Sequence, residues 1–148
     1  MRIIIGYGNR LRGEDGFGCD VLEELKKYEL TNTKLLYAFQ LTPEICLELL
    51  DASEIIFIDA CYLEDTQFHY NLGCSLENQN RNLSHHISPQ MIIELLKSIY
   101  HKNPNYCIYG MFTNQFNQIL STTKYTETVN KVCYELEKRG RECPIFII

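Results

Sequence analysis

Two adjacent carboxylates, Glu14 and Asp15, stand in a glycine-rich stretch that follows the first apolar run of the chain. The stretch reads GYGN from Gly6, before the acids, and GFG from Gly16, after them. Acidic side chains at the carboxyl end of a first strand would lie where open α/β sheets hold their ligands. Such a loop could bind a phosphate, bind a metal ion or cap a helix.

The pattern does not fit a nucleotide loop. A G-x-G-x-x-G fingerprint would need glycine at Leu11, and a P-loop would end in G-K-[ST], where this loop ends in Gly13-Glu14-Asp15. Two carboxylates would also repel a pyrophosphate. A small nucleotide-binding α/β domain is therefore the less favoured alternative. A second alternative is that both acids only cap the helix starting at Gly16, where negative charge is favourable.

Two later segments carry groups of the same kind. Asp59 ends the apolar segment Glu54–Asp59, and it could cap the next turn or serve as a functional group at the sheet edge. His85 and His86 precede a helix start, where either could be solvated, contact a cap or act as a ligand. Two oxygen ligands and one imidazole on loops beyond strand ends can bind a divalent ion and leave coordination positions open.

No nucleophile system is evident in the sequence. It contains no G-x-S-x-G elbow, no H-E-x-x-H and no cysteine-protease context, and we interpret Cys19 and Cys61 as packing residues. The chain has 7 scattered cysteines without a C-x-x-C pair. This usage favours reduced, mostly buried thiols over a zinc site or a disulfide framework.

Composition predicts one globular domain, residues 1–148, in the cytoplasm. The net charge is -5 and no run of Lys or Arg occurs, which disfavours nucleic acid and anionic membrane surfaces as partners. No apolar run approaches the roughly 20 residues that a membrane helix needs, and the start of the chain lacks the pattern of a secretory signal.

Strands alternate with helices along the chain. This order predicts an α/β fold with three α/β/α layers around a twisted, mostly parallel sheet of about five strands. The apolar segments predict strands at Arg2–Gly6, Leu35–Phe39, Glu54–Asp59, Tyr106–Phe112, and less regularly at Phe68–Leu72. The apolar segment Pro144–Ile148 could form a short edge strand or a docked tail. Helical spacing and N-cap residues predict helices at Asp15–Lys27, Thr42–Asp51, Met91–Tyr100 and Ser121–Arg139, the last stopped by Gly140, with a loop at Leu76–Asn82.

Several of these motifs resemble the [NiFe]-hydrogenase maturation endopeptidases. The opening pattern of that family is roughly G-x-G-N-x-L-x-x-D-[DE]-G-x-G-x-x-V, and this chain departs from it only in carrying Glu14 for the usual first Asp. The segment FIDA at Phe57–Ala60 matches the second acidic motif, and His85 with Ile87-Ser88 matches the histidine motif. The QLTPE segment, Gln40–Glu44, resembles the subgroup that serves cytosolic bidirectional or cofactor-reducing hydrogenases.

The resemblance implies a phosphorylase/hydrolase-like fold and a catalytic, metal-recognising site. Asp15, Asp59 and His85 would be the ligands, with His86 as the second choice for the imidazole, and Glu14 would be a neighbour that tunes the site. The enzyme would remove the C-terminal extension of the hydrogenase large-subunit precursor after nickel insertion. The nickel would be recognised in the precursor and would not need to stay on the isolated enzyme.

The resemblance also bears on partners and alternatives. It implies that the partner is the large-subunit precursor, and we expect a monomer with no nucleic-acid or membrane partner. A non-catalytic chaperone that binds nickel or the precursor would need the same ligands, so it remains an alternative. The segments at Gln40-Leu41-Thr42 and at 114–117 depart from many relatives, and we expect both to bear on substrate choice.

Overall fold

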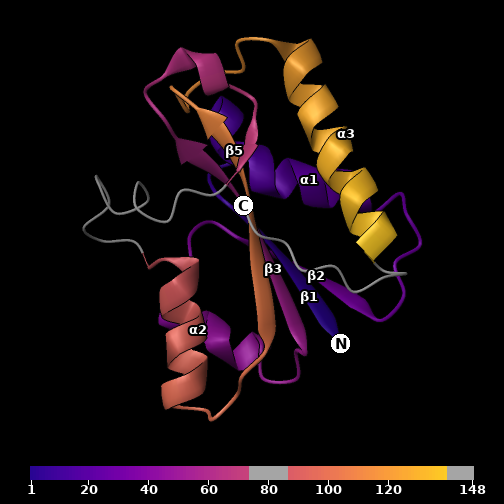
Figure 1. Cartoon of the computed structure of the whole chain (residues 1–148), viewed down its shortest axis with the longest axis vertical. Helices are drawn as coiled ribbons and strands as arrows, with labels where there is room; N and C mark the ends of the chain where they lie inside the picture. The colour runs from indigo at the N-terminus through magenta and orange to yellow at the C-terminus, as the bar shows by residue number, and fades with distance from the viewer. Residues whose placement is uncertain (74–86, 140–148) are drawn as a thin grey trace.

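A five-stranded sheet forms the middle layer of the protein, as the computed structural model shows for residues 1–73 and 87–139 (Figure 1). The strand order is β2-β1-β3-β5-β4. Four strands run parallel, and β4 pairs antiparallel with β5 at one edge. The strand bounds are β1 (Arg2–Tyr7), β2 (Thr33–Ala38), β3 (Glu54–Tyr62), β4 (Leu72–Gly73) and β5 (Asn105–Thr113).

Helices cover both faces of the sheet, which confirms the three-layer α/β/α prediction. On one face lie α1 (Phe17–Leu25) and α3 (Thr122–Arg139), and on the other lie α2 (Pro89–Ser98) and the 3-10 helix η2 (Pro43–Glu48) (Figure 1). Within the described residues, no helix is both long and apolar enough to cross a membrane.

The central strand β3 shows why both faces need a cover. Ile55 and Phe57 pack in the core beneath α2 and η2, whereas Ile56 and Ile58 pack in the core beneath α1 and α3. All four are fully buried. Successive strand side chains point to opposite faces, so a strand that is apolar throughout requires a helix layer on each side.

The predicted caps are confirmed where two long helices begin. The Ser88 hydroxyl accepts the Met91 amide at 3.2 Å at the start of α2, and the Ser121 hydroxyl accepts the Lys124 amide at 3.3 Å at the start of α3. The Thr42 side chain makes no such bond before η2, which is a 3-10 helix rather than the predicted α-helix.

Other predicted bounds differ from the structure. The first helix begins at Phe17 rather than Asp15, because the acids lie in a separate 3-10 turn, η1 (Gly13–Gly16). The strand predicted over Phe68–Leu72 is wrong, since η3 (Thr66–Phe68) and the short β4 occupy this region. The loop at Leu76–Asn82, the stop at Gly140 and the segment Pro144–Ile148 lie outside the described residues.

Helix α1 lies unusually close to the sheet at Gly18. A Cβ added there would be 2.2 Å from the Ile58 carbonyl oxygen and 2.7 Å from the Tyr7 amide nitrogen. The third glycine of a dinucleotide fingerprint, absent at Leu11, would allow this kind of close helix packing. Here Gly18 allows it instead, and the approach fixes the turn that precedes the helix against the end of β1.

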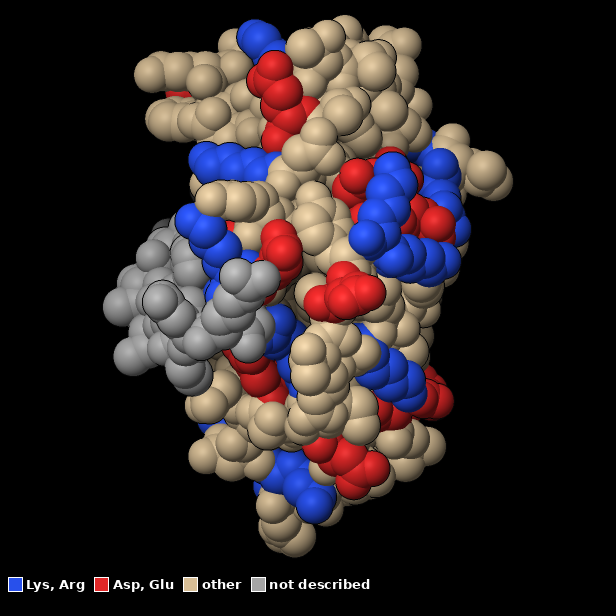
Figure 2. All heavy atoms as spheres, turned by 90° about the vertical axis from the view of Figure 1, so that its right-hand side faces the viewer, with Lys and Arg blue, Asp and Glu red and all other residues tan. Residues whose placement is uncertain are grey.

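Charges are mixed on the face shown in Figure 2. Lys and Arg side chains lie among Asp and Glu side chains there and do not form one continuous basic area. Ion pairs along α1, such as Lys26 with Glu23 and Lys27 with Glu24, show the same mixing at the level of single helix turns. All cysteines of the described segments are buried.

Candidate functional site at the carboxyl edge of the sheet

Asp15 and Asp59 both lie at the carboxyl edge of the parallel strands. Asp15 is in η1, the turn that follows the loop after β1, and Asp59 lies on β3, one residue beyond the point where Gly6 of β1 pairs with Ile58. Both residues are partly buried. The alternation along β3 directs the Asp59 side chain toward the α2 face, the same side as Ile55 and Phe57.

The Asp59 carboxyl is electrostatically coupled to Asp15. Burial raises the pKa of Asp59 well above its ordinary value, and the negative charge of Asp15 raises it further. Hydrogen bonds from the Ala60 amide, at 2.7 Å, and from Tyr7 act in the opposite direction but do not cancel the shift. A proton or a nearby cation would relieve the cost of a negative charge on the buried Asp59 carboxyl.

Asp15 is held in place by its own loop. Its Oδ2 accepts the Asn9 amide at 3.0 Å, and its amide donates to the carbonyl oxygens of Arg12, at 3.0 Å, and Phe116, at 3.2 Å. No side chain caps α1, whose N-cap residue is Gly16. The helix-cap interpretation of the acid pair is therefore wrong as far as side-chain hydrogen bonds are concerned.

The amides of the glycine loop are already used within the protein. The Gly8 amide donates to the Ala38 carbonyl, and the Asn9 amide donates to the Asp15 carboxylate. The Leu11 amide donates to the Asn9 side chain, and the Arg12 amide donates to the Asn9 carbonyl. A phosphate cradle requires such amides to point at the ligand. The loop therefore does not offer the donors that the nucleotide-binding alternative needs.

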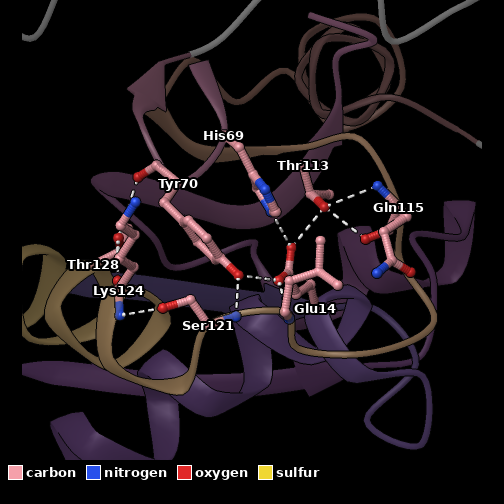
Figure 3. A network of polar contacts seen from close by, with 9 residues as sticks. Glu14, His69, Tyr70, Thr113, Gln115, Ser121, Lys124 and Thr128 are labelled. Carbon is pink, nitrogen blue, oxygen red and sulfur yellow. Dashed lines mark hydrogen bonds and ion pairs between the residues drawn. The ribbon is translucent and has the colours of Figure 1, made fainter. Parts of the chain in front are cut away.

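Glu14 points to a different place from Asp15. Its side chain is fully buried and meets four donors from distant parts of the chain (Figure 3). Oε1 lies 2.6 Å from His69 Nε2 and 2.6 Å from Thr113 Oγ1, and Oε2 lies 2.6 Å from the Tyr70 hydroxyl and 3.2 Å from the Leu120 amide. A carboxylate offers about four lone-pair positions, and the protein occupies all of them.

The environment of Glu14 keeps it ionised. Burial alone would raise its pKa, but the hydrogen bonds from Thr113, Tyr70, His69 and the Leu120 amide outweigh burial, and the pKa is lowered. Burial and the bond to Glu14 raise the pKa of Tyr70 to about 12, so its hydroxyl stays a donor. Because a carboxylate only accepts, His69 donates through a protonated Nε2.

Sequence reasoning did not identify His69, Tyr70 or Thr113 as part of this network. The ring of His69 stacks on that of Tyr70 with a centroid separation of 3.8 Å, and the Tyr70 hydroxyl also accepts the Ser121 amide at 2.8 Å. The partners of Glu14 that follow η3 or end β5 stand more than fifty residues away from it in sequence. The only available signal was that an unpaired carboxylate beside a buried strand requires donors from somewhere.

The predicted histidines, His85 and His86, lie outside the described residues. Among residues 1–73 and 87–139, no three His, Cys, Asp or Glu side chains group closely enough to hold a metal ion. Cys19, near both acids, is an inert thiol: burial raises its pKa to about 11, and its Sγ lies 3.6 Å from the Gly6 carbonyl oxygen.

The fold, with two coupled carboxyls at the carboxyl edge of its sheet, is the fold of the hydrogenase maturation proteases. No protein-family model matches the sequence, and no curated protein matches it. The solved structures that it resembles share its architecture at low sequence identity.

Three of these structures show the extent of the likeness. The hydrogenase maturating endopeptidase HybD from E. coli is 16% identical, with a TM-score of 0.71 over 95% of this chain and 92% of that one. The protease HycI from Thermococcus kodakarensis is 16% identical, with a TM-score of 0.69 over 95% and 92%. The hydrogenase 2 maturation peptidase from a Thaumarchaeota archaeon is 19% identical, with a TM-score of 0.63 over 93% and 96%.

Proposed function

We propose that this protein is an endopeptidase of [NiFe]-hydrogenase maturation. It removes the C-terminal extension of the large-subunit precursor after nickel has been inserted, in the cytoplasm and as a monomer. The observation that carries the proposal is the coupled carboxyl pair Asp15 and Asp59, placed at the ligand edge of a fold that maturation proteases share. The QLTPE segment leads us to propose a cytosolic hydrogenase as the source of the precursor.

In this proposal the precursor's nickel is part of the substrate. Asp15 and Asp59 supply two oxygen ligands and His85 an imidazole nitrogen, a set that suits nickel while leaving positions for the precursor's own ligands. The chemistry of the pair supports this, because a cation near both acids would relieve the repulsion that raises the Asp59 pKa. The metal would polarise the scissile carbonyl or a bound water.

Glu14 is left out of the ligand set for a physical reason. All four of its acceptor positions face protein donors, so ligation would break hydrogen bonds that no water could replace in a fully buried site. Asp15 Oδ2 accepts a single amide bond, from Asn9, and keeps acceptor capacity for a metal.

The test is cleavage of nickel-loaded precursor, followed by the mass of the large subunit. The wild type should remove the tail, and Asp15→Asn, Asp59→Asn and His85→Ala should lose at least about 100-fold in rate, as expected when a catalytic ligand is lost. Asp51→Asn, on an exposed acid, and His86→Ala are matched controls and should stay active.

The outcomes separate the alternatives. Full cleavage by both the Asp15 and His85 variants would overturn the assigned site. Loss of activity in His86→Ala with activity retained in His85→Ala would transfer the imidazole role to His86. A wild type that binds the precursor and leaves its mass unchanged would favour the maturation chaperone over the peptidase.

A further inference from the structure

We propose that Glu14 is a positioning residue, which holds Asp15 in place through the four hydrogen bonds of its carboxylate and not through its charge. The inference rests on the proposed function of Asp15. The sequence led us to expect that Glu14 tunes the site without ligating the metal, and such tuning could act through charge or through position. These two roles predict opposite results for simple substitutions of Glu14.

The Glu14 carboxylate joins three segments that leave the carboxyl edge of the sheet. Its own turn, η1, follows β1; His69 and Tyr70 follow β3 and η3; Thr113 and Leu120 lie at and beyond the end of β5 (Figure 3). Backbone bonds already join two of these segments, because Thr113 pairs with Tyr62 of β3 and the Tyr70 amide donates to the Phe112 carbonyl at 2.9 Å. The buried carboxylate ties η1 to both of them.

A second set of contacts carries this fixation to Asp15. The Asp15 amide donates to the Phe116 carbonyl, and the Arg12 guanidinium donates twice to Asn117 Oδ1, at 2.9 and 3.0 Å. Gly13 lies against Gln118, since a Cβ at Gly13 would come within 2.4 Å of the Gln118 Cα. If the segment after β5 moves, the turn that carries Asp15 must move with it.

The Tyr70 side chain extends the network into α3. The Tyr70 hydroxyl accepts a hydrogen bond from the Ser121 amide while donating to Glu14. The backbone carbonyl oxygen of Tyr70 accepts the Thr128 hydroxyl at 3.1 Å (Figure 3). Tyr70 itself has a φ of +70°, a backbone conformation that L residues rarely adopt. The surrounding contacts hold it there, as expected for a residue with a fixed task.

Length and charge can be separated at position 14. Glu14→Asp keeps the charge but withdraws the carboxylate by about one C–C bond, about 1.5 Å, from donors that lie at 2.6 Å. Glu14→Gln removes the charge and keeps the length. The NH2 group of the new side chain can donate to both His69 and Thr113. His69 then accepts as its other neutral tautomer, and the Thr113 hydroxyl donates instead to the Gln115 carbonyl, which already lies 2.6 Å away.

The experiment measures kcat and KM for precursor cleavage together with the NMR signal of the Asn9 amide, whose hydrogen bond to Asp15 Oδ2 reports on the position of that carboxylate. For Glu14→Asp we expect kcat to fall by about 10- to 100-fold, with KM within about threefold, because a misplacement of about 1 Å can cost 100-fold. Glu14→Gln should stay within about threefold of the wild type. The Asn9 signal should move more in the Asp variant than in the Gln variant.

Tyr70→Phe tests the same network with a matched control. It removes one donor to Glu14, and Tyr125→Phe removes a buried hydroxyl that donates to the Asp20 carboxylate between α3 and α1. Both variants keep their rings, so both should fold. We expect lower kcat and a shifted Asn9 signal only for Tyr70→Phe.

Several results would overturn the inference. If kcat falls as far in Glu14→Gln as in Glu14→Asp, Glu14 acts through its charge. If kcat does not fall in Glu14→Asp, Glu14 has no positioning role. Equal losses of kcat in the two tyrosine variants would indicate a general effect of lost stability. If the wild type cleaves nothing, the proposed function fails, and the Asn9 signal still decides whether Glu14 positions Asp15.

Discussion

Replacing Gly18 by alanine should destabilise the protein, because the close approach of α1 to the sheet leaves no room for a Cβ. The new atom would lie 2.2 Å from the Ile58 carbonyl oxygen, and ordinary contact begins at 3.4 Å. Since neither the strand backbone nor the helix backbone can rotate away, α1 would have to move by about 1.2 Å. Overpacking of this kind costs about 3 kcal/mol at the upper end of its usual range.

Part of that cost is offset, because alanine favours a helix over glycine by about 1 kcal/mol. The net expectation is a loss of about 2 kcal/mol in the free energy of unfolding, which for a domain of this size lowers Tm by about 6 °C. Urea denaturation followed by circular dichroism measures the first quantity, and a thermal scan measures the second.

Gly16→Ala provides the control for this experiment. A Cβ there would be 3.1 Å from the Arg10 Cα and no closer than 3.6 Å to any other atom, so we expect a loss below about 1 kcal/mol. If Gly18→Ala proves as stable as the wild type, or loses no more than Gly16→Ala, the close packing of α1 on β1 and β3 is wrong.

Two further predictions concern acidic side chains. Asp59→Asn should raise the free energy of unfolding at neutral pH. The raised pKa of Asp59 means that the native state keeps this proton to higher pH than the unfolded chain, so the free energy of unfolding of the wild type falls as pH rises from the unfolded to the native pKa. Urea titrations between pH 4 and 8 should show a shallower fall in the variant, and an equal slope would refute the raised pKa of Asp59. Glu54→Ala should lower the free energy of unfolding by about 2 kcal/mol in urea denaturation, because the Glu54 carboxylate contacts both Arg2, at 3.1 Å, and Arg139, at 3.2 Å. The exposed pair of Glu94 with Lys97 provides the control, and Glu94→Ala should cost less than about 0.5 kcal/mol.

The layers of the fold could be predicted because the strands consist largely of buried residues. Runs such as Ile3–Ile5 and Ile55–Ile58 leave no polar face, and this indicates a parallel sheet covered on both sides. Short elements were harder. In η2, Ile45 and Cys46 are buried while Leu47 is exposed, and six residues do not separate a period of 3.6 from one of 3.0.

The site was predictable only in part, because its contacts join distant parts of the chain. The sequence places Asp15 after one apolar segment and Asp59 at the carboxyl end of another, which is enough to expect both at the carboxyl edge of a parallel sheet. It cannot show that Tyr70 and Thr113 meet at Glu14, since their positions depend on how the segments after β3 and β5 pack. Whether His85 completes the set remains a prediction from the sequence.

The different tasks of the two adjacent acids follow from the geometry of the turn that holds them. In a 3-10 helix of three residues per turn, successive side chains diverge by about 120°. Within η1 this sends the Glu14 side chain into the buried network and leaves Asp15 beside Asp59. An α-helix beginning at Asp15 would have left Glu14 outside the helix with no such fixed direction. The separate turn before α1 is therefore the feature that allows one acid to anchor the loop while its neighbour remains available for a ligand.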